Sequence, residues 1–149
     1  MERYRKAKPA KVILASDHAG FKLKEEIKKY LIKKRKKVLD LGTKKTISVD
    51  YPDYAHKVCL MVVKNKFNIG VLICGSGIGM AMAANKHKNI RAALCYSVKN
   101  AKLSRLHNDA NVITLGSRFT NNKTAFNCLN AFLSTKFEGG RHKKRVKKI

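Results

Sequence analysis

The stretch IGVLICGSGIG, residues 69–79, joins an uncharged apolar run to a turn rich in glycine. The run Ile69–Cys74 is typical of a strand with both faces buried, as in a parallel sheet. The glycines break the strand, and the residues that follow predict a helix over Met80–Asn85. A buried strand that turns directly into a helix is the repeating unit of α/β folds. This stretch therefore predicts an α/β domain with parallel strands.

Strands and helices alternate in the same way on both sides of this stretch. The predicted strands are Lys11–Ser16, Val38–Leu41, Ile69–Cys74, Ala92–Cys95 and Val112–Leu115. The predicted helices are Phe21–Lys34, Pro52–Lys64 with Asp50 as its cap, Met80–Asn85, a helix that Ser97 caps and that ends near Leu106, Lys123–Leu133, and a basic helix after Glu138. The alternation predicts a three-layer, Rossmann-like domain, in which helices cover both faces of a five-stranded parallel sheet. With right-handed crossovers we expect the strand order 2-1-3-4-5.

A length of 149 residues suits one domain. We expect residues 11–149 to form it, and residues 1–10, MERYRKAKPA, to be a basic leader in front of it. The leader has no apolar stretch after its charges, which argues against a secretory signal. No apolar run in the chain approaches the roughly 18 residues that a membrane span needs. We therefore expect a cytoplasmic protein.

The formal net charge is +25, from 34 lysines and arginines against 9 aspartates and glutamates. Such a charge favours nucleic acid or another polyanion as a partner. However, the basic residues are mostly lysines, concentrated in KKYLIKKRKK and in the tail RHKKRVKKI, with few aromatic residues among them. No nucleic-acid-binding motif is present. Solvated helix faces account for most of the charge, so we expect no specific nucleic-acid partner.

The four cysteines are not spaced like a metal-binding or redox pair. Cys59, Cys95 and Cys128 lie in apolar runs and are expected to fill the core. Cys74 instead ends a strand and precedes a turn into a helix, where the helix N-terminus favours a negatively charged thiolate. A thiolate there could abstract a proton. Position alone supports a functional and a structural Cys74 equally.

In the expected strand order, the chain leaves the first and third strands in opposite directions, and ligands bind at the carboxyl ends of such strands. Those ends carry Asp17-His18 and Cys74-Gly75-Ser76-Gly77. Backbone N–H groups in the turn Gly75–Gly79 can bind an oxyanion or a phosphate, although the turn could also be purely structural. The turn does not have the GxGxxG spacing of a dinucleotide-binding site.

Further polar residues could belong to a site or serve locally. Asp17 could bind a ligand or cap the next helix, and His107-Asn108 lies in the loop segment RLHNDAN. Arg141 and Arg145 are four residues apart, and two arginines on one helical face match a phosphate group. The same arginines could equally be part of a solvated basic tail.

Several segments resemble the type B ribose-5-phosphate isomerases of the ribose/galactose isomerase family and, more loosely, the galactose-6-phosphate isomerase subunits. They are ASDHAGFKLKEEI, SVDYPDYA, ICGSGIGMAMAANK, IRAALC, AKLSRLHNDANVITLGSR and FEGGRHKKRV. The resemblance implies an enzyme without metal or other cofactor that interconverts D-ribose 5-phosphate and D-ribulose 5-phosphate through a cis-enediolate, in the pentose phosphate pathway. It also implies a homodimer or a dimer of dimers, with each active site at the subunit interface.

The resemblance also implies roles for individual residues. Cys74 matches the base that moves a proton between C1 and C2 of the open-chain sugar. One branch of the family uses a glutamate at the position of Ile78, which cannot act as a base. Ser76 replaces the family's threonine and keeps its hydroxyl group. With the N–H groups of Gly75, Gly77, Ile78 and Gly79, it would stabilise the enediolate oxygen.

His107 resembles the family's ring-opening residue, and Asp17 would bind sugar hydroxyls and help protons to move between oxygens. The expected phosphate-binding residues are His18, Arg141 and Arg145, with Arg118 and Asn108 nearby in role. Tyr51 matches a tyrosine that lines the pocket. Several of these residues are expected to come from the partner subunit.

Two other functions are compatible with parts of the sequence. One is isomerisation of a six-carbon sugar phosphate, such as allose or galactose 6-phosphate. The presence of His107 and of the tail GGRHKKRV favours the five-carbon substrate. The other is a basic RNA-binding protein that has lost catalysis, which only the net charge supports. The complete set of Cys74, His107, Asp17 and both tail arginines argues against that loss.

Overall fold

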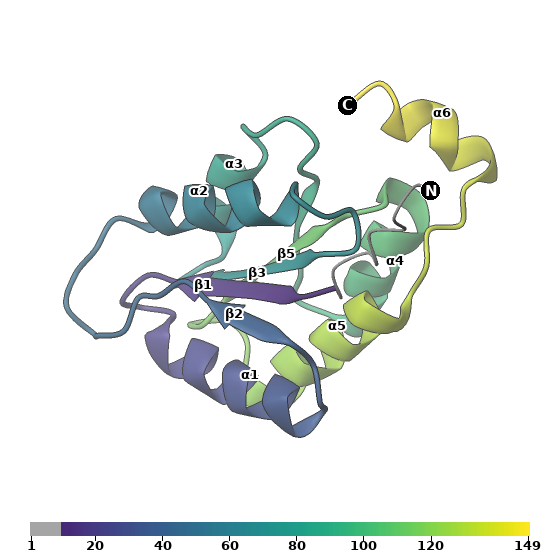
Figure 1. Ribbon diagram of the computed structural model, residues 1–149. Coiled ribbons are helices and arrows are strands. Elements are labelled where there is room, and N and C mark those ends of the chain that lie inside the picture. Colours follow the sequence, from purple (N-terminus) through teal and green to yellow (C-terminus); the bar gives the residue numbers. More distant parts are fainter. Residues whose placement is uncertain (1–9) are drawn as a thin grey trace, which may run out of the picture.

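A parallel sheet lies between two layers of helices in the computed structural model, which describes residues 10–149 (Figure 1). The expected basic leader, residues 1–10, lies outside the described residues except for Ala10. The strands are β1 (Val12–Ser16), β2 (Val38–Asp40), β3 (Ile69–Cys74), β4 (Ala92–Leu94) and β5 (Val112–Gly116). Every pair of neighbouring strands is parallel. The predicted fold class is therefore confirmed.

Each face of the sheet has its own hydrophobic core. One core contains apolar residues of α1 (Phe21–Lys33), α4 (Val98–Asn108) and α5 (Asn122–Ser134). The other contains apolar residues of α2 (Tyr51–Val62) and α3 (Ile78–Ala84). Figure 1 shows the same division, with α2 and α3 above the sheet and α1 and α5 below it. None of the helices within residues 10–149 has the length and apolar character that crossing a bilayer requires.

Two predicted helix caps occupy the expected positions. The Ser97 hydroxyl accepts the N–H of Asn100 at 3.2 Å, and the Asn100 side chain bonds back to the backbone N–H of Ser97. Asp50 is the N-cap residue of α2, without a side-chain bond to the helix. The expected basic tail helix is short, because it consists of the 3₁₀ turn η1 (Gly140–His142) and α6 (Lys143–Val146). This tail stands away from the sheet in Figure 1.

The expected strand order is wrong for the last two strands, since the sheet has the order β2-β1-β3-β5-β4. The cause is the face that α4 covers. α4 packs in the same core as α1, so the two helices cover the same face of the sheet. A right-handed crossover on that face runs in the direction that leads from β1 to β2. The connection from β4 through α4 therefore places β5 on the side of β4 that faces the middle of the sheet. The three residues of β4 are left half-buried at the edge, whereas β5 is buried along its whole length.

The outer edge of β4 bonds to asparagine side chains. The Asn85 side chain accepts the N–H of Ala92 at 2.7 Å and donates to its carbonyl at 3.0 Å. The Asn100 side chain donates to the carbonyl of Leu94 at 2.8 Å. The bonded backbone groups face away from β5. The two asparagine side chains give them the hydrogen-bond partners that a further strand would otherwise supply.

The pairing of β1 with β3 is independent of the error in strand order. Ser16 pairs with Ile73, and the N–H of Asp17 donates to the carbonyl of Ile73 at 3.2 Å. The residues that follow these two strands, Asp17 and Gly75, therefore leave the sheet at the same edge. This is the edge at which the sequence predicts a ligand site.

A buried ion pair holds α1 against the end of β2. The Lys24 ammonium is fully buried and lies 2.7 Å from Asp40 and 2.6 Å from Glu25. Lys28 lies 2.9 Å from Asp40, and the N–H of Gly42 donates to the other oxygen of that carboxylate. Burial opposes ionisation of Asp40, but the hydrogen bonds from Lys24, Gly42 and Lys28 outweigh it and lower the pKa of Asp40 below its ordinary value.

Replacing Asp40 by asparagine should lower the free energy of unfolding by about 3 kcal/mol, because the change removes a carboxylate from a buried ammonium. Asp40 has a lower pKa in the folded chain than in the unfolded one, so its contribution is complete above about pH 4 and is lost as the pH falls through the folded-state value. Urea unfolding of both proteins at about pH 7 and about pH 3 measures the difference, which should shrink at the lower pH.

The exposed pair between Lys29 and Glu26, at 2.9 Å, provides the matched control. Glu26→Gln should change stability little at either pH, because solvent screens exposed ion pairs. Equal losses in Asp40→Asn and Glu26→Gln would contradict a special role for the buried pair.

Candidate active site

Cys74 lies at the carboxyl end of β3 with its thiol against the following turn. Its side chain is buried, at 5% exposure, and the N–H of Gly77 donates to Sγ at 3.1 Å. Gly77 has a φ of +78°, a left-handed conformation that favours glycine and aims this N–H back at the sulfur. A backbone N–H directed at sulfur stabilises the thiolate form of a cysteine.

The turn after Cys74 is lined by polar groups and by two larger side chains. The Ser76 hydroxyl is half-buried and accepts the N–H of Ile78 at 3.2 Å. The Tyr51 ring lies directly over Gly79, where an added Cβ would come within 2.5 Å of it. The Arg118 guanidinium lies against Gly75, where an added Cβ would come within 2.8 Å. Because both neighbours are glycines, the ring and the cation reach the turn itself.

Asp17 and His18 approach the same edge from β1. Asp17 is buried, and one of its carboxylate oxygens accepts the N–H of Gly20 at 3.0 Å, so part of its role is to cap the turn before α1. His18 accepts the N–H of Val49 at Nδ1, at 3.1 Å. The neutral tautomer consistent with that bond has its proton on Nε2, which makes Nε2 a hydrogen-bond donor. Cys74, Ser76, Asp17, His18, Tyr51 and Arg118 thus belong to one group.

The other predicted site residues lie at the opposite edge of the sheet. His107 and Asn108 end α4, and the carbonyl of Asn108 accepts a bond from Arg91, the residue just before β4. They are therefore near the amino ends of the strands. The six-residue strand β3 separates the two edges by roughly 20 Å. Within one chain His107 cannot reach Cys74.

The C-terminal tail joins His107 at that edge. Glu138 donates its N–H to the carbonyl of Leu106 at 3.1 Å, which anchors the start of the tail to α4. The His142 ring stacks on the His107 ring, with 4.2 Å between centroids and an 11° angle between planes. A carboxylate oxygen of Glu138 lies 3.4 Å from Nε2 of His142 and 3.8 Å from Nε2 of His107. Arg141 and Arg145 are exposed on the same tail.

Sequence reasoning missed Glu138 and His142. Their four-residue spacing within FEGGRHKKRV was the available signal, since it is the spacing of neighbours on a helix. Burial, the proximity of His107 and the charge of Arg141 lower the pKa of His142 below its ordinary value. The neutral imidazole is therefore the main form of His142 at neutral pH.

The other three cysteines are fully buried core residues, as predicted. Burial raises the pKa of Cys59 and that of Cys95 to about 12. Burial also raises the pKa of the Cys128 thiol. These thiols remain neutral at physiological pH and have no part in proton transfer. Chemistry at a cysteine is therefore confined to Cys74.

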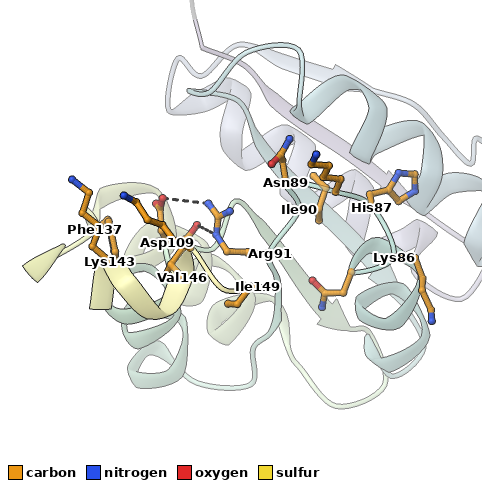
Figure 2. A pocket seen from close by; sticks show the side chains of 13 residues that line it. Lys86, His87, Asn89, Ile90, Arg91, Asp109, Phe137, Lys143, Val146 and Ile149 are labelled. Carbon is orange, nitrogen blue, oxygen red and sulfur yellow. Dashed lines mark hydrogen bonds and ion pairs between the residues drawn. The ribbon is translucent and has the colours of Figure 1, made fainter. Parts of the chain in front are cut away.

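A cleft of about 820 Å³ contains none of the predicted site residues. It lies between the loop that joins α3 to β4 and the C-terminal tail, and it includes the ion pair of Arg91 with Asp109 at 3.2 Å (Figure 2). Its lining is a mixture of basic, amide and apolar side chains, including Lys86, Lys88, Lys143, Lys147, Asn85, Asn89, Ile90, Phe137 and Val146. We assign the candidate active site to the Cys74 edge, because that edge combines a thiol, a carboxylate and a turn with N–H donors.

Comparison with known proteins identifies the family. The ribose/galactose isomerase family matches residues 12–149. The chain belongs to this family. Ribose-5-phosphate isomerase B of Escherichia coli strain K12 is 43% identical over 139 residues, which cover 93% of each chain.

Two solved structures of family members have the same fold. The ribose 5-phosphate isomerase B of Anaplasma phagocytophilum is 53% identical, with a TM-score of 0.87 over 93% of this chain and 94% of that one. The Mycoplasma genitalium ribose-5-phosphate isomerase B was solved with bound ribulose-5-phosphate. It is 44% identical, with a TM-score of 0.90 over 93% of this chain and 92% of that one.

An alkylating reagent such as iodoacetamide should modify Cys74 alone in the folded protein at about pH 8. Cys74 keeps 5% exposure at the end of β3, whereas the other three thiols are completely buried and burial raises their pKa. Mass spectrometry of peptides identifies the modified residue. Cys74→Ser should remain unlabelled when folded, whereas its three other thiols should react in urea. Labelling of Cys59, Cys95 or Cys128 in the folded protein would contradict this description of the core.

Proposed function

We propose that this chain is an aldose–ketose isomerase that interconverts D-ribose 5-phosphate and D-ribulose 5-phosphate. The observation that carries the proposal is the Cys74 thiol, which accepts the N–H of Gly77 and lies beside the turn Gly75–Gly79. Removal of a proton next to a carbonyl needs a base at the carbon and positive partial charge at the oxygen. Both requirements are met at one edge of the sheet. The relatives named above are isomerases of this kind.

In the proposed mechanism the Cys74 thiolate removes the C2 proton of open-chain ribose 5-phosphate. The electron pair of that C–H bond forms the C1–C2 double bond of a cis-enediolate, and the carbonyl electrons move to O1. The O2 hydroxyl proton passes to O1, with Asp17 placed to help that transfer. The thiol then returns its proton to C1 while the electrons on O2 form the C2 carbonyl, which gives ribulose 5-phosphate. The Ser76 hydroxyl and backbone N–H groups of the turn Gly75–Gly79 stabilise the negative oxygen, while the N–H of Gly77 donates to Cys74 and that of Ile78 to Ser76. The Ile78 side chain takes no part.

The residues around Cys74 would bind and orient the sugar. Asp17 is placed to accept hydroxyl protons, and the Tyr51 ring forms a wall over Gly79. Nε2–H of His18 and the Arg118 guanidinium are donors suited to the phosphate or to hydroxyl groups. Correct orientation of the reacting carbons makes a large contribution to such catalysis.

We propose that a second copy of the chain completes each site in a homodimer or a dimer of dimers. His107, Asn108, Arg141 and Arg145 cannot reach Cys74 of their own chain, because they lie at the opposite edge of the sheet. The surface near the Cys74 turn carries exposed apolar side chains, namely Ile78, Met82, Tyr96 and Phe119. Such a patch favours burial against another protein surface. The second copy would supply His107 for ring opening and the two arginines for phosphate binding.

The proposed reaction belongs to the pentose phosphate pathway, and we propose that it takes place in the cytoplasm. All four cysteines are free thiols, which suits a reducing compartment. We also propose that residues 11–149 act as one catalytic domain. The proposed chemistry uses side chains and backbone donors only, without a metal or an organic cofactor.

Cys74→Ala should lower turnover of ribose 5-phosphate at least about a hundredfold, as expected for loss of a general base. Binding of substrate, measured calorimetrically, should persist. Cys128→Ala is the matched control, since Cys128 is a buried thiol outside the site and its replacement should affect stability rather than catalysis. Turnover retained by Cys74→Ala would refute the proposed base. Faster turnover of allose 6-phosphate than of ribose 5-phosphate would refute the proposed substrate.

The proposed assembly predicts complementation between two inactive variants. Cys74→Ala and His107→Asn should each be nearly inactive alone on ring-closed sugar. When equal amounts are unfolded and refolded together, half of the dimers should contain one of each chain, and one of the two sites in such a dimer has both residues intact. The mixture should then recover about a quarter of the parent activity. No recovery, with mixed dimers demonstrated by native mass spectrometry, would contradict a site shared between copies.

A further inference from the structure

His107, Glu138 and His142, here called the His–Glu–His cluster, form a group of metal-binding side chains at the end of α4. We propose that this cluster binds a divalent transition-metal ion such as Zn²⁺, and that the bound ion reversibly inhibits the isomerase. Two imidazoles and one carboxylate are a donor set that zinc uses in enzymes, with a fourth position open to water. The inhibitory part of the inference rests on the proposed function, whereas the binding part does not.

The ligand atoms are already close to the spacing that zinc needs. One atom from each side chain lies within 4.8 Å of the other two. Glu138 is 3.4 Å from Nε2 of His142 and 3.8 Å from Nε2 of His107. Bonds of about 2.0–2.2 Å in a tetrahedral site put ligand atoms roughly 3.3–3.5 Å apart. The planes of the two stacked rings differ by 11°. To bind one ion, the rings must tilt so that a nitrogen lone pair of each points at it.

The backbone holds the three side chains together before any ion arrives. The N–H of Glu138 donates to Leu106, the residue before His107, so the carboxylate and the first imidazole are joined through one hydrogen bond. Glu138 and His142 are linked by a 3₁₀ turn and are four residues apart. A site assembled in advance loses less conformational entropy when it binds.

The protonation state of His142 also suits an ion. Nε2 of His142 accepts a long hydrogen bond from Nε of Arg141, at 3.4 Å, so this nitrogen is unprotonated, and an ion takes its lone pair by displacing the Arg141 side chain. An unprotonated imidazole nitrogen is the form that binds metal. The charges of Arg141 and Arg145 oppose a dication. We therefore expect affinity on the order of micromolar, which permits reversible control.

The consequence for catalysis follows from His107. In the proposed function this residue opens the furanose ring in the active site of a second copy. An ion bound to Nε2 occupies the lone pair and fixes the ring in the cluster, so His107 can no longer transfer protons to or from the sugar. Inhibition should therefore be strong with ring-closed ribose 5-phosphate and weak with an open-chain analogue.

The test is a titration of the purified full-length protein with ZnSO₄ in the absence of substrate, followed by isothermal calorimetry. We expect one zinc per chain. Glu138→Gln and His142→Gln should each weaken binding at least about tenfold, since even partners of metal ligands contribute that much. Substitution with Co²⁺ should give visible absorption bands in the parent protein that both variants lack.

Two control variants exclude another place where zinc could bind. His56→Gln disrupts the surface pair in which Nδ1 of His56 lies 2.7 Å from Nε2 of His87. His87→Gln removes the other ring of the same pair. Neither change should affect zinc binding. If zinc binding is lost in either control, or is unchanged in both Glu138→Gln and His142→Gln, the proposed site is overturned.

Activity assays then test the regulatory part. Zinc should inhibit the parent enzyme, excess EDTA should restore its rate, and the half-inhibitory concentration should rise at least about tenfold in Glu138→Gln, with each protein compared with its own metal-free rate. Zinc bound at the cluster with undiminished turnover of ring-closed sugar would overturn inhibition. A metal-free parent enzyme without isomerase activity would instead contradict the proposed function and leave the calorimetric result standing.

Discussion

The pairing of β1 with β3 is the constraint from which the candidate site follows. Parallel strands end at the same edge, so the pairing of Ser16 with Ile73 brings Asp17 beside the residues that follow Cys74. The bond from the N–H of Asp17 to the carbonyl of Ile73 continues that ladder by one step. The site then depends on where each strand ends. The glycines after Cys74 end β3, and the turn capped by Asp17 ends β1.

Much of the fold could be predicted, because buried strands leave a clear mark in the sequence. Ile69–Cys74 has the predicted bounds, and Ser97 caps α4 as expected. The order of β4 and β5 could not be predicted with the same method, because it depends on the face that α4 covers. Periodicity identifies the apolar side of a helix, and it does not report which side of a sheet that helix will pack against. Only the structure shows that the short β4 is half-buried, as an edge strand is.

The site could be predicted in part for a similar reason. Residues at the ends of strands are placed by the sheet, and Asp17, Cys74 and Ser76 therefore lie at the same edge. His107 lies on a helix that runs back toward the opposite edge, and no pattern within one chain reports a contact with another copy. Glu138 and His142 lie in a tail with little regular structure, so their stacking and pairing with His107 depend on tertiary contacts that only the structure shows.

The asparagine side chains along β4 affect how the protein behaves at high concentration. A free sheet edge is a template on which the strand of a neighbouring molecule can add. Here Asn85 and Asn100 imitate such a strand, because they already occupy the outward N–H and C=O groups of Ala92 and the carbonyl of Leu94. The edge is therefore closed by the chain itself. Strand addition is therefore disfavoured at the β4 edge of the sheet.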